Sequence, residues 1–205
     1  MYDVNGVSKD VKTEANMKVS REQVALNRER IVETAARLFR EKGYDGIGVA
    51  DLMKNAGLTH GGFYGHFASK EDLLAEATAH ALKRSVDRWR GYVEQGADTA
   101  LDKIGASYLS LKHRDGPANG CSVTSLGADI GRLGPKARHA MTEGASAQMA
   151  VLEQLMPGAD DADKRRQAVA TYAAMVGAIV LSRAVDDEAL SLEILQAVQA
   201  SLPSR

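Results

Sequence analysis

The chain has 205 residues, of which 44% are hydrophobic and only 5% are aromatic. This composition supports a buried core but does not favour strands, because runs of alternating β-branched residues are missing. The formal net charge of −1 excludes a protein that binds nucleic acid through a strongly basic overall charge. The single cysteine, Cys121, excludes an intramolecular disulfide and a cysteine-based zinc site. An alanine-rich chain of this kind is predicted to be all-α.

The distribution of charged and apolar residues adds two expectations. Residues 1–90 hold 15 Lys and Arg against 13 Asp and Glu, whereas residues 91–205 hold 11 against 14, so the first half is slightly basic. The N-terminus lacks the pattern of a secretory signal, and the longest apolar run, 172–181, is too short to span a bilayer. We therefore expect a soluble, cytoplasmic protein.

The N-terminal region predicts a polar arm followed by a long amphipathic helix. Residues 1–19 are expected to form a disordered arm, and Met17 is an alternative start of the chain. A helix is predicted over 21–42, because apolar residues recur along one stripe, and Gly43 is expected to end it. Arg28 lies near the start of this helix and could either contact a DNA phosphate or lie on a solvated face.

The stretch VADLMKNAGLTHGGFYGHF has the pattern of a helix-turn-helix. Apolar residues at helical spacing predict a first short helix from Val49 to about Ala56, and Gly57 follows where a left-handed residue ends a helix. Thr59 occupies the position of an N-cap whose hydroxyl would accept a hydrogen bond from an amide of the next turn. The second helix is expected over 60–67, where a recognition helix would enter the major groove.

This second helix is unusually rich in glycine, since Gly61, Gly62 and Gly65 each cost about 1 kcal/mol relative to alanine in a helix interior. Phe63 and Phe67 are four residues apart and are predicted to anchor the helix to the core. Missing side chains allow the backbone to approach a phosphate or a base edge closely. The polar residues left to face outward are His60, Tyr64 and His66, the first of which is expected to read a base edge. The alternative is a flexible loop with two buried aromatic residues.

Three segments between Arg30 and Leu82 carry a resemblance to a known family: IVETAARLFREKGYDG, VADLMKNAGLTHGGFYGHF and SKEDLLAEA. They resemble the N-terminal DNA-binding domain of the TetR/AcrR family of transcriptional regulators, with helices and turns in the family's order over about a quarter of the chain. The resemblance implies a small all-helical dimer whose divergent C-terminal domain binds a ligand and controls the affinity for DNA.

The resemblance also suggests which residues contact DNA. Ile47 and Gly48 depart from the family pattern, which has small hydroxyl residues here, so one hydroxyl contact to a phosphate is lost while Gly48 can still cap the helix. Lys70 matches the basic residue of the family and is expected to contact a phosphate, as is Tyr64. The predicted DNA-binding residues are Arg28, Gly48, Val49, Thr59, His60, Gly61, Gly62, Tyr64, His66 and Lys70.

The predicted fold is all-α, with a three-helix DNA-binding domain at 20–68 and a helical ligand-binding and dimerisation domain at 69–205. Ser69 is expected to cap a helix that reaches about Tyr92 and joins the two domains. Prolines and apolar periodicity divide the remaining chain into helices near 98–113, 120–132, 135–156, 161–184 and 187–201.

The last two predicted helices carry small and apolar residues that could pack in their own core or form a four-helix dimer interface, which the resemblance favours. A two-fold dimer would present two recognition helices to a pseudo-palindromic operator. The predicted interface residues are Ala170, Ala174, Gly177, Ala178, Leu181, Leu190, Ile194 and Val198.

The helices from about 98 to 156 are expected to enclose a mainly apolar pocket for a small apolar inducer. Apolar residues at helical spacing do not encode one ligand, and each candidate could equally be ordinary core. The predicted wall of the pocket consists of Trp89, Tyr108, Leu111, Cys121, Met141, Met149, Tyr172 and Met175.

No arrangement of side chains in the sequence predicts an enzyme, a cofactor or a metal site. His60 and His66 would lie about 120° apart around a helix, which makes them a poor pair of metal ligands. Two interpretations remain. The chain is either a ligand-responsive repressor that leaves its operator when an inducer binds, or an all-helical small-molecule-binding or metabolic protein whose helix-turn-helix is only structural. The salt dependence of binding distinguishes these two interpretations, since a DNA-binding protein loses affinity as a power of the salt concentration.

Overall fold

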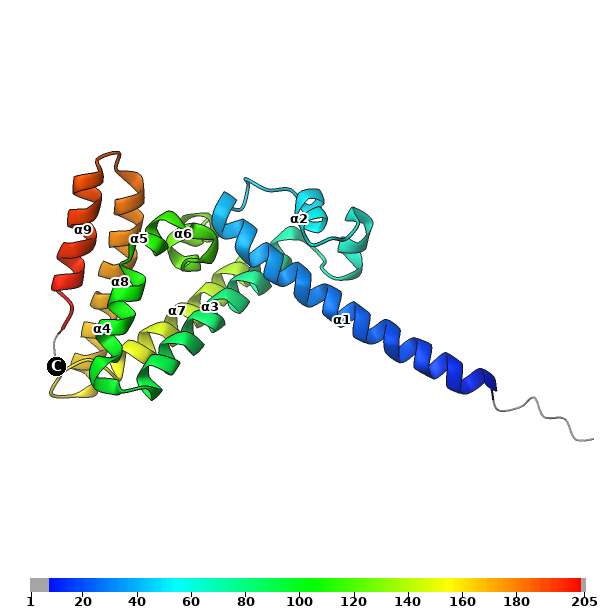
Figure 1. Ribbon diagram of the computed structural model, residues 1–205, viewed down its shortest axis with the longest axis horizontal. Coiled ribbons are helices and arrows are strands. Elements are labelled where there is room, and N and C mark those ends of the chain that lie inside the picture. Colours follow the sequence, from blue (N-terminus) through cyan, green and yellow to red (C-terminus); the bar gives the residue numbers. More distant parts are fainter. Residues whose placement is uncertain (1–7, 204–205) are drawn as a thin grey trace, which may run out of the picture.

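The structure is a computed structural model that describes residues 8–203, and every regular element in that range is helical. In Figure 1, α1 projects from one end of the molecule, and the pair α8 and α9 forms the opposite end. The elements are α1 (Ser8–Lys42), α2 (Val49–Asn55), η1 (His60–Gly65), α3 (Lys70–Glu94), α4 (Ala97–Tyr108), α5 (Leu111–Asp115), η2 (Pro117–Asn119), α6 (Ser122–Ile130), α7 (Pro135–Glu153), α8 (Asp161–Ala184) and α9 (Glu188–Ala200).

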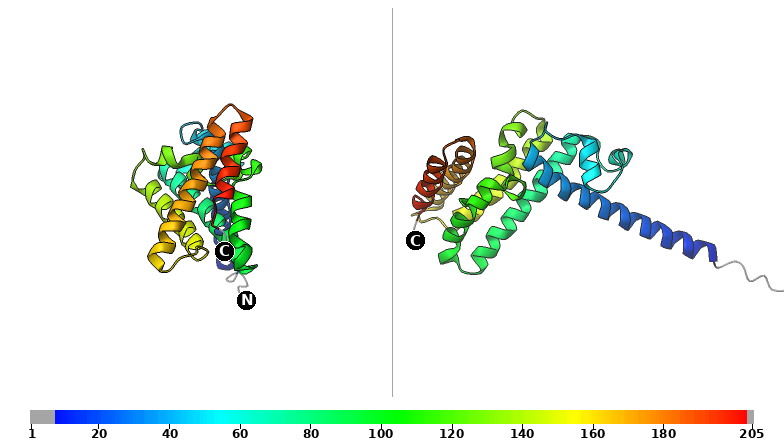
Figure 2. Two further views of the ribbon diagram at one scale, coloured as in Figure 1. Left: turned by 90° about the vertical axis from the view of Figure 1, so that its left-hand side faces the viewer. Right: turned by 45° about the horizontal axis from the view of Figure 1, so that its top comes forward.

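The long helix α3 connects two hydrophobic cores. Its first turns contribute Leu73 and Leu74 to an N-terminal core that also holds side chains of α1, α2 and η1. Its later turns contribute Val86 and Trp89 to a C-terminal core formed with α4, α7, α8 and α9. α7 runs alongside α3, as Figures 1 and 2 show from different sides. A displacement of α3 along α7 would therefore disturb both cores.

Helix α6 packs against the N-terminal part of the chain. Leu126 and Ile130 of α6 are buried in the N-terminal core together with Phe39 of α1. The backbone amide of Tyr44, just after α1, donates a hydrogen bond of 2.9 Å to Asp129 Oδ2. The predicted boundary between residues 68 and 69 therefore does not separate the two cores. Helices α3 and α6 both follow it in the sequence, and both contribute side chains to the N-terminal core.

Local signals explain where several helices begin and end. Ser69 Oγ accepts a hydrogen bond of 3.0 Å from an amide in the first turn of α3, as predicted for an N-cap. Gly43 and Gly57 have φ angles of 77° and 71°, the left-handed conformation that ends a helix at little cost only when the residue is glycine. The side chains of Asp160 and Asp187 cap α8 and α9 in the same way as Ser69 caps α3.

The start of α1 differs from the expectation. The helix begins at Ser8 rather than at Arg21, so the stretch 8–19, which we predicted to be part of a disordered arm, is helical. This stretch contains no glycine or proline, and its lysine, glutamate, alanine and methionine residues are good helix formers. Residues 1–7 of the predicted arm lie outside the described residues.

The helix predicted over 98–113 is divided in two. α4 ends at Tyr108, and the Ser110 hydroxyl then accepts a hydrogen bond of 3.2 Å from the amide of His113 and starts α5. Serine competes with the helical backbone for hydrogen bonds and so favours such a break. The later helices agree with the predicted ranges to within a few residues at each end.

The close approach of α3 and α7 makes a testable prediction at Gly144 of α7. A Cβ atom added at this residue would lie 2.5 Å from Leu82 Cβ in α3. We expect Gly144→Ala to lower the free energy of unfolding by about 1–3 kcal/mol, because overpacking outweighs the gain in helix propensity. Equilibrium urea denaturation at one fixed protein concentration measures the change.

Gly91→Ala is the matched control. Gly91 lies in α3, and an added Cβ would have no other atom within 4 Å. Its substitution should therefore raise the free energy of unfolding by about 0.5–1 kcal/mol through helix propensity alone. Equal stabilisation by both substitutions would contradict the close packing of α3 on α7.

Candidate functional site

Buried side chains hold α2 and η1 in a helix-turn-helix. Leu52 and Met53 of α2, and Phe63 and Phe67 in and just after η1, are at most 4% exposed and belong to the N-terminal core. Gly57 makes the left-handed turn between the two elements. The arrangement predicted from the sequence is therefore confirmed, including the two aromatic anchors.

The second element has a different form from the one predicted. It is a 3₁₀-helix over His60–Gly65 rather than an α-helix over 60–67. Three glycines in six residues weaken α-helix formation, and short 3₁₀ segments are common as connectors. Thr59 is the N-cap residue, but its hydroxyl accepts no capping hydrogen bond, so that detail of the prediction is wrong.

The polar residues of η1 face outward to different degrees. Tyr64 is 69% exposed, and the ring of His60, also exposed, lies edge-on to it with centroids 6.3 Å apart. His66 is half-buried, and its Nδ1 atom is buried without a hydrogen-bond partner in the described part of the chain. Gly48 caps α2 without a side-chain hydrogen bond and is exposed, whereas Val49 is half-buried.

The three glycines of η1 have no structural reason within the chain to be glycine. None of them has a positive φ, since Gly43, Gly57 and Gly96 are the only described glycines that do. A Cβ atom at Gly61 or Gly65 would have no other atom within 4 Å, and at Gly62 it would lie 3.7 Å from Met53 Cε, an ordinary contact. The missing side chains therefore leave space for something outside the chain.

Two basic residues predicted to contact DNA have partners within the chain. Lys70 Nζ donates a hydrogen bond of 2.5 Å to Tyr44 O and lies 4.2 Å from the centroid of the Tyr44 ring. Arg28 forms an ion pair of 2.5 Å with Glu76, and its guanidinium lies 4.7 Å from the centroid of the Phe67 ring. An ammonium and a guanidinium each have further N–H donors, so contact with a phosphate stays a prediction for both.

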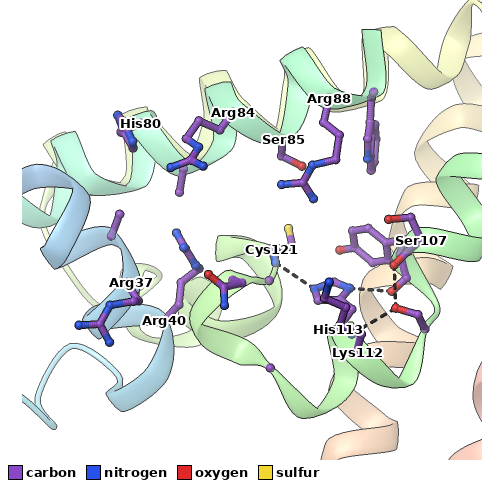
Figure 3. Close-up of a pocket in the computed structure, with 18 of the residues that line it drawn as sticks. Arg37, Arg40, His80, Arg84, Ser85, Arg88, Ser107, Lys112, His113 and Cys121 are labelled. Carbon is purple, nitrogen blue, oxygen red and sulfur yellow. Dashed lines mark hydrogen bonds between the residues drawn. The ribbon is translucent and has the colours of Figure 1, made fainter. Parts of the chain in front are cut away.

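A cavity of about 670 Å³ lies between α1, α3 and the segment from the end of α4 to Cys121. Figure 3 shows side chains from α1 and α3 on facing walls of this cavity, with His113 and Cys121 on a third wall. Its volume is within the range of small-molecule sites in proteins. The N-terminal and C-terminal parts of the chain both contribute to it.

Three of the eight residues predicted to form the wall of a ligand pocket line this cavity. Trp89, Tyr108 and Cys121 line the cavity, but the other five candidates do not. Leu111 is 45% exposed, whereas the remaining four pack in or against the cores as the alternative interpretation held: Met141, Met149, Tyr172 and Met175. Apolar residues at helical spacing mark buried surface, and most buried surface belongs to a core.

The cavity is also basic rather than mainly apolar. Five lining residues are Arg or Lys and one is acidic: Arg37, Arg40, Arg84, Arg88, Lys112 and Glu33. Sequence reasoning missed these residues. One signal was available, because His80, Arg84 and Arg88 follow each other at a spacing of four and therefore share a face of α3.

His113 is held as a neutral imidazole at one side of the cavity. The Cys121 amide donates a hydrogen bond of 2.9 Å to His113 Nε2, and His113 Nδ1 lies 2.6 Å from Tyr108 O. Nε2 therefore accepts and Nδ1 carries the proton. Burial lowers the pKa of His113 to about 4, and the charges of Arg183 and Arg88 act in the same direction, while the hydrogen bond to Tyr108 opposes them.

The predicted dimer interface is exposed at some positions and buried at others. Ala170, Ala174, Leu181 and Leu190 are exposed, Leu181 by 55%, and Gly177 is half-buried with no atom within 4 Å of an added Cβ. The other three are less accessible. Ala178 is 2% exposed in the C-terminal core, and Ile194 and Val198 pack against that core.

Helix α8 carries further exposed apolar side chains that were not predicted, Val169 and Val180. Figure 1 shows α8 and α9 side by side at the end of the molecule, without another element on their outer side. Among the described residues, α8 is the one helix whose length and mean hydropathy would also allow it to cross a bilayer, a property that core helices of soluble proteins share.

Comparison with known proteins identifies relatives in the part that holds the helix-turn-helix. The family model described as bacterial regulatory proteins, tetR family, matches residues 31–77. The HTH-type transcriptional repressor NemR of Escherichia coli strain K12 is 27% identical over 161 residues, which cover 74% of this chain and 81% of that protein. The HTH-type transcriptional repressor KstR2 of Mycobacterium tuberculosis strain H37Rv is 36% identical over 94 residues, covering 44% of this chain and 47% of that protein.

Solved structures extend the similarity to the whole fold. The reduced form of E. coli NemR has a TM-score of 0.71 and 25% identity, and the match covers 87% of this chain and 99% of that one. FadR of Bacillus subtilis, solved in complex with stearoyl-CoA, has a TM-score of 0.59 and 20% identity, with 85% and 99% covered. At this identity FadR supports the fold alone.

The buried His113 makes a prediction about the effect of pH. Since its ordinary pKa is 6.5 and its folded value is about 4, the unfolded chain binds the proton first as the pH falls. The stability that depends on the neutral ring is complete above about pH 6.5 and is lost as the pH falls towards 4. Between pH 7 and pH 5, the free energy of unfolding should fall by about 2 kcal/mol more in the wild type than in His113→Gln.

Urea denaturation at both pH values measures this difference, and His139→Gln is the control. His139 lies exposed on α7, so its substitution should leave the pH dependence of the wild type intact. Parallel losses of stability in the wild type and in His113→Gln would show that the His113 ring is not held neutral.

Proposed function

Because the chain belongs to the TetR family of bacterial transcriptional regulators, we propose that it is a ligand-responsive repressor that binds a pseudo-palindromic operator as a dimer. The observation that carries the proposal is the glycine face of η1. Neither a close contact nor a positive φ within the chain requires glycine at these positions, so the backbone at Gly61, Gly62 and Gly65 can lie directly against a duplex.

Side chains beside this face would complete the contact with DNA. Tyr64 and His60 are exposed at the outer side of η1, and their hydroxyl and imidazole groups can reach a phosphate and a base edge, respectively. Lys70 stands at the start of α3, where its remaining N–H donors can contact a phosphate. With so few side chains available, part of the sequence preference would come from the shape of the DNA.

The exposed residues of α8 and α9 support the dimer. Leu181, Val180 and Leu190 are large apolar side chains on the outer side of the helix pair, and Ala174 and Gly177 between them allow close helix packing. Two such pairs would form a four-helix interface that buries these side chains. A two-fold axis through this interface would place the two η1 elements on successive turns of one duplex face.

A small molecule would be the signal. The relatives NemR and KstR2 are named as repressors, and FadR, which shares the fold, was solved in complex with stearoyl-CoA. In this chain the cavity between α1 and α3 is the candidate ligand site, since the domain of residues 69–205 and the DNA-binding domain of residues 20–68 both line it. The protein would act in the cytoplasm as a regulator rather than as an enzyme.

Gly62→Leu tests binding through the glycine face. A Cβ atom at residue 62 would make only an ordinary contact, 3.7 Å from Met53 Cε, so the chain has room for it. The added bulk of leucine would hold the η1 backbone away from the duplex, so operator affinity should fall by about a hundredfold or more while stability is kept. Gly91→Leu, at a glycine of α3 that lies outside the helix-turn-helix and has space for a side chain, should bind like the wild type. Fluorescence anisotropy with an operator selected from a random duplex library measures both affinities over a range of salt concentrations.

Unchanged affinity in Gly62→Leu would show that η1 does not approach DNA. If no duplex in the library is bound with a steep dependence on salt, the chain is a small-molecule-binding or metabolic protein with a structural helix-turn-helix. This second function is the alternative because the cavity exists whether or not DNA is bound.

Gly177→Arg tests the dimer. An arginine at this open position would place an unpaired charge in the middle of the proposed interface, so the variant should sediment as a folded monomer and bind a half-site weakly. Ala106→Arg, on the exposed side of α4, should remain dimeric. Sedimentation velocity at micromolar concentration measures the oligomeric state of all three proteins. A wild type that is monomeric at this concentration would contradict the dimer proposal.

A further inference from the structure

The cavity between α1 and α3 holds more positive charge than its own carboxylates can balance. Glu33 pairs with Arg84 at 3.3 Å, and Arg37 pairs with Glu41 at 3.2 Å. Three further cationic residues line the cavity without an ion pair in the described part of the chain: Arg40, Arg88 and Lys112. An enclosed group of like charges with low-dielectric walls attracts an anion more strongly than an open surface does.

Three guanidinium groups converge on one region of this cavity. Figure 3 shows Arg84 and Arg88 reaching from α3 toward Arg40 on α1, whereas Arg37 points away from the space between them. Arg84 and Arg88 are one turn apart on the same face of α3. A carboxylate or phosphate between them would receive donors from two helices, in the forked geometry that guanidinium groups favour.

Among the arginines of the cavity, Arg40 has the least favourable surroundings for its positive charge. Its Nε and Nη2 atoms donate to Ala118 O at 3.0 and 2.6 Å, but Nη1 is buried and has no partner among the described residues. Burial lowers the pKa of Arg40 to about 10, and the neighbouring charges of Arg84 and Arg88 act in the same direction. A bound anion would remove this repulsion, and a small rotation of the guanidinium would give Nη1 an acceptor.

One part of the cavity lining is apolar, although Ser107 and His113 lie beside it. Trp89, Tyr108 and Cys121 are buried there, and the Trp89 and Tyr108 rings meet edge to face with centroids 6.0 Å apart. Such a wall favours an aromatic ring or an aliphatic chain. The expectation of an apolar ligand therefore holds for one end of the site only.

We propose that this cavity binds a small organic anion, with a carboxylate or phosphate held by Arg40, Arg84 and Arg88 and an apolar body against Trp89 and Tyr108. An anion of this class would be the signal that the proposed repressor responds to. Only the predicted effect of the anion on operator binding depends on the repressor function. A duplex is a poorer occupant, because Arg40 lines a cavity and is half-buried, with its Nη1 atom fully buried, rather than lying on an outer surface.

The site is placed to act on the DNA-binding elements. Arg40 is in the last turns of α1, and its contact with Ala118 joins α1 to η2. An anion that draws Arg40 toward Arg84 and Arg88 competes with this contact and shifts α1 relative to η2. Anion binding then weakens operator binding, and the operator weakens anion binding by the same factor.

Trp89 reports directly on the site, because it is the only tryptophan in the chain. The probes are 4-phenylbutanoate, its neutral amide, phenyl phosphate and inorganic phosphate, each titrated into the full chain without DNA. The phenylbutanoate or the phenyl phosphate should change the Trp89 fluorescence and bind at least about tenfold more tightly than the amide. Whichever of these two probes binds more tightly shows whether a carboxylate or a phosphate is preferred. Weaker binding of inorganic phosphate would show that the apolar body contributes to the affinity.

Arg88→Gln and Arg37→Gln form the matched pair of variants. Arg88 is exposed at the α3 wall and has no ion pair among the described residues, so its substitution should preserve the fold and weaken the anion by about tenfold. Arg37→Gln removes the same charge from a side chain that points away, and it should bind the anion like the wild type. Arg40→Gln should weaken binding further, with circular dichroism to confirm that it is folded.

Several results would overturn the proposal. The amide could bind as tightly as the acid, all four probes could fail to bind at millimolar concentration, or Arg37→Gln could match Arg88→Gln. Loss of operator affinity in Arg88→Gln with a reduced salt slope and unchanged anion binding would instead assign the cluster to DNA phosphates. Arginine-dependent anion binding by a chain that binds no operator would support the site and reject the repressor function.

Discussion

The packing of α3 along α7 joins the two cores of this molecule, because α3 contributes side chains to both of them. Gly144 of α7 lies so close to Leu82 that there is no room for a Cβ atom, and above and below this point α3 anchors Leu74 in one core and Trp89 in the other. Cores packed at the density of proteins do not deform continuously. A change at the C-terminal end of α3 is therefore transmitted along the helix to the elements around η1.

Helix α6 supplies a second and shorter connection. It enters the N-terminal core through Leu126 and Ile130, and Asp129 accepts a hydrogen bond from the amide of Tyr44, whose carbonyl in turn accepts one from Lys70. The cavity lies beside this connection, with Cys121 at the start of α6 in its wall. A ligand there would have only a few contacts between itself and the DNA-binding elements, which suits a two-state switch.

Two parts of the molecule bear costs that nothing among the described residues offsets. The glycines of η1 each weaken the helix by about 1 kcal/mol without a steric or conformational reason. Arg40 is buried beside Arg84 and Arg88 with one donor unsatisfied. Natural sequences keep such inconsistencies mainly where function requires them. Each cost would be relieved by the partner proposed for it, a duplex in the first case and an anion in the second.

The sequence by itself determined the local elements of this protein. The apolar spacing of α2, the left-handed Gly57, the anchors Phe63 and Phe67 and the cap Ser69 could all be predicted, because each depends on residues within one or two turns. The same reasoning found the exposed Tyr64, since a polar side chain between two anchors must face away from the core. It misjudged the helix type of η1, where three glycines in six residues weaken the α-helix and a short 3₁₀-helix forms instead.

Only the tertiary structure decided the character of the cavity and of the α8 and α9 face. Arg40 on α1 and Arg88 on α3 are distant in the sequence, and no local pattern shows that their side chains line the same cavity. Likewise, Ala174 and Ala178 are one turn apart and equally small, yet one is exposed and the other buried. The physical reason is the same in both cases. Propensity and periodicity are properties of one helix, whereas burial and the balance of charge are set by which other helices pack against it.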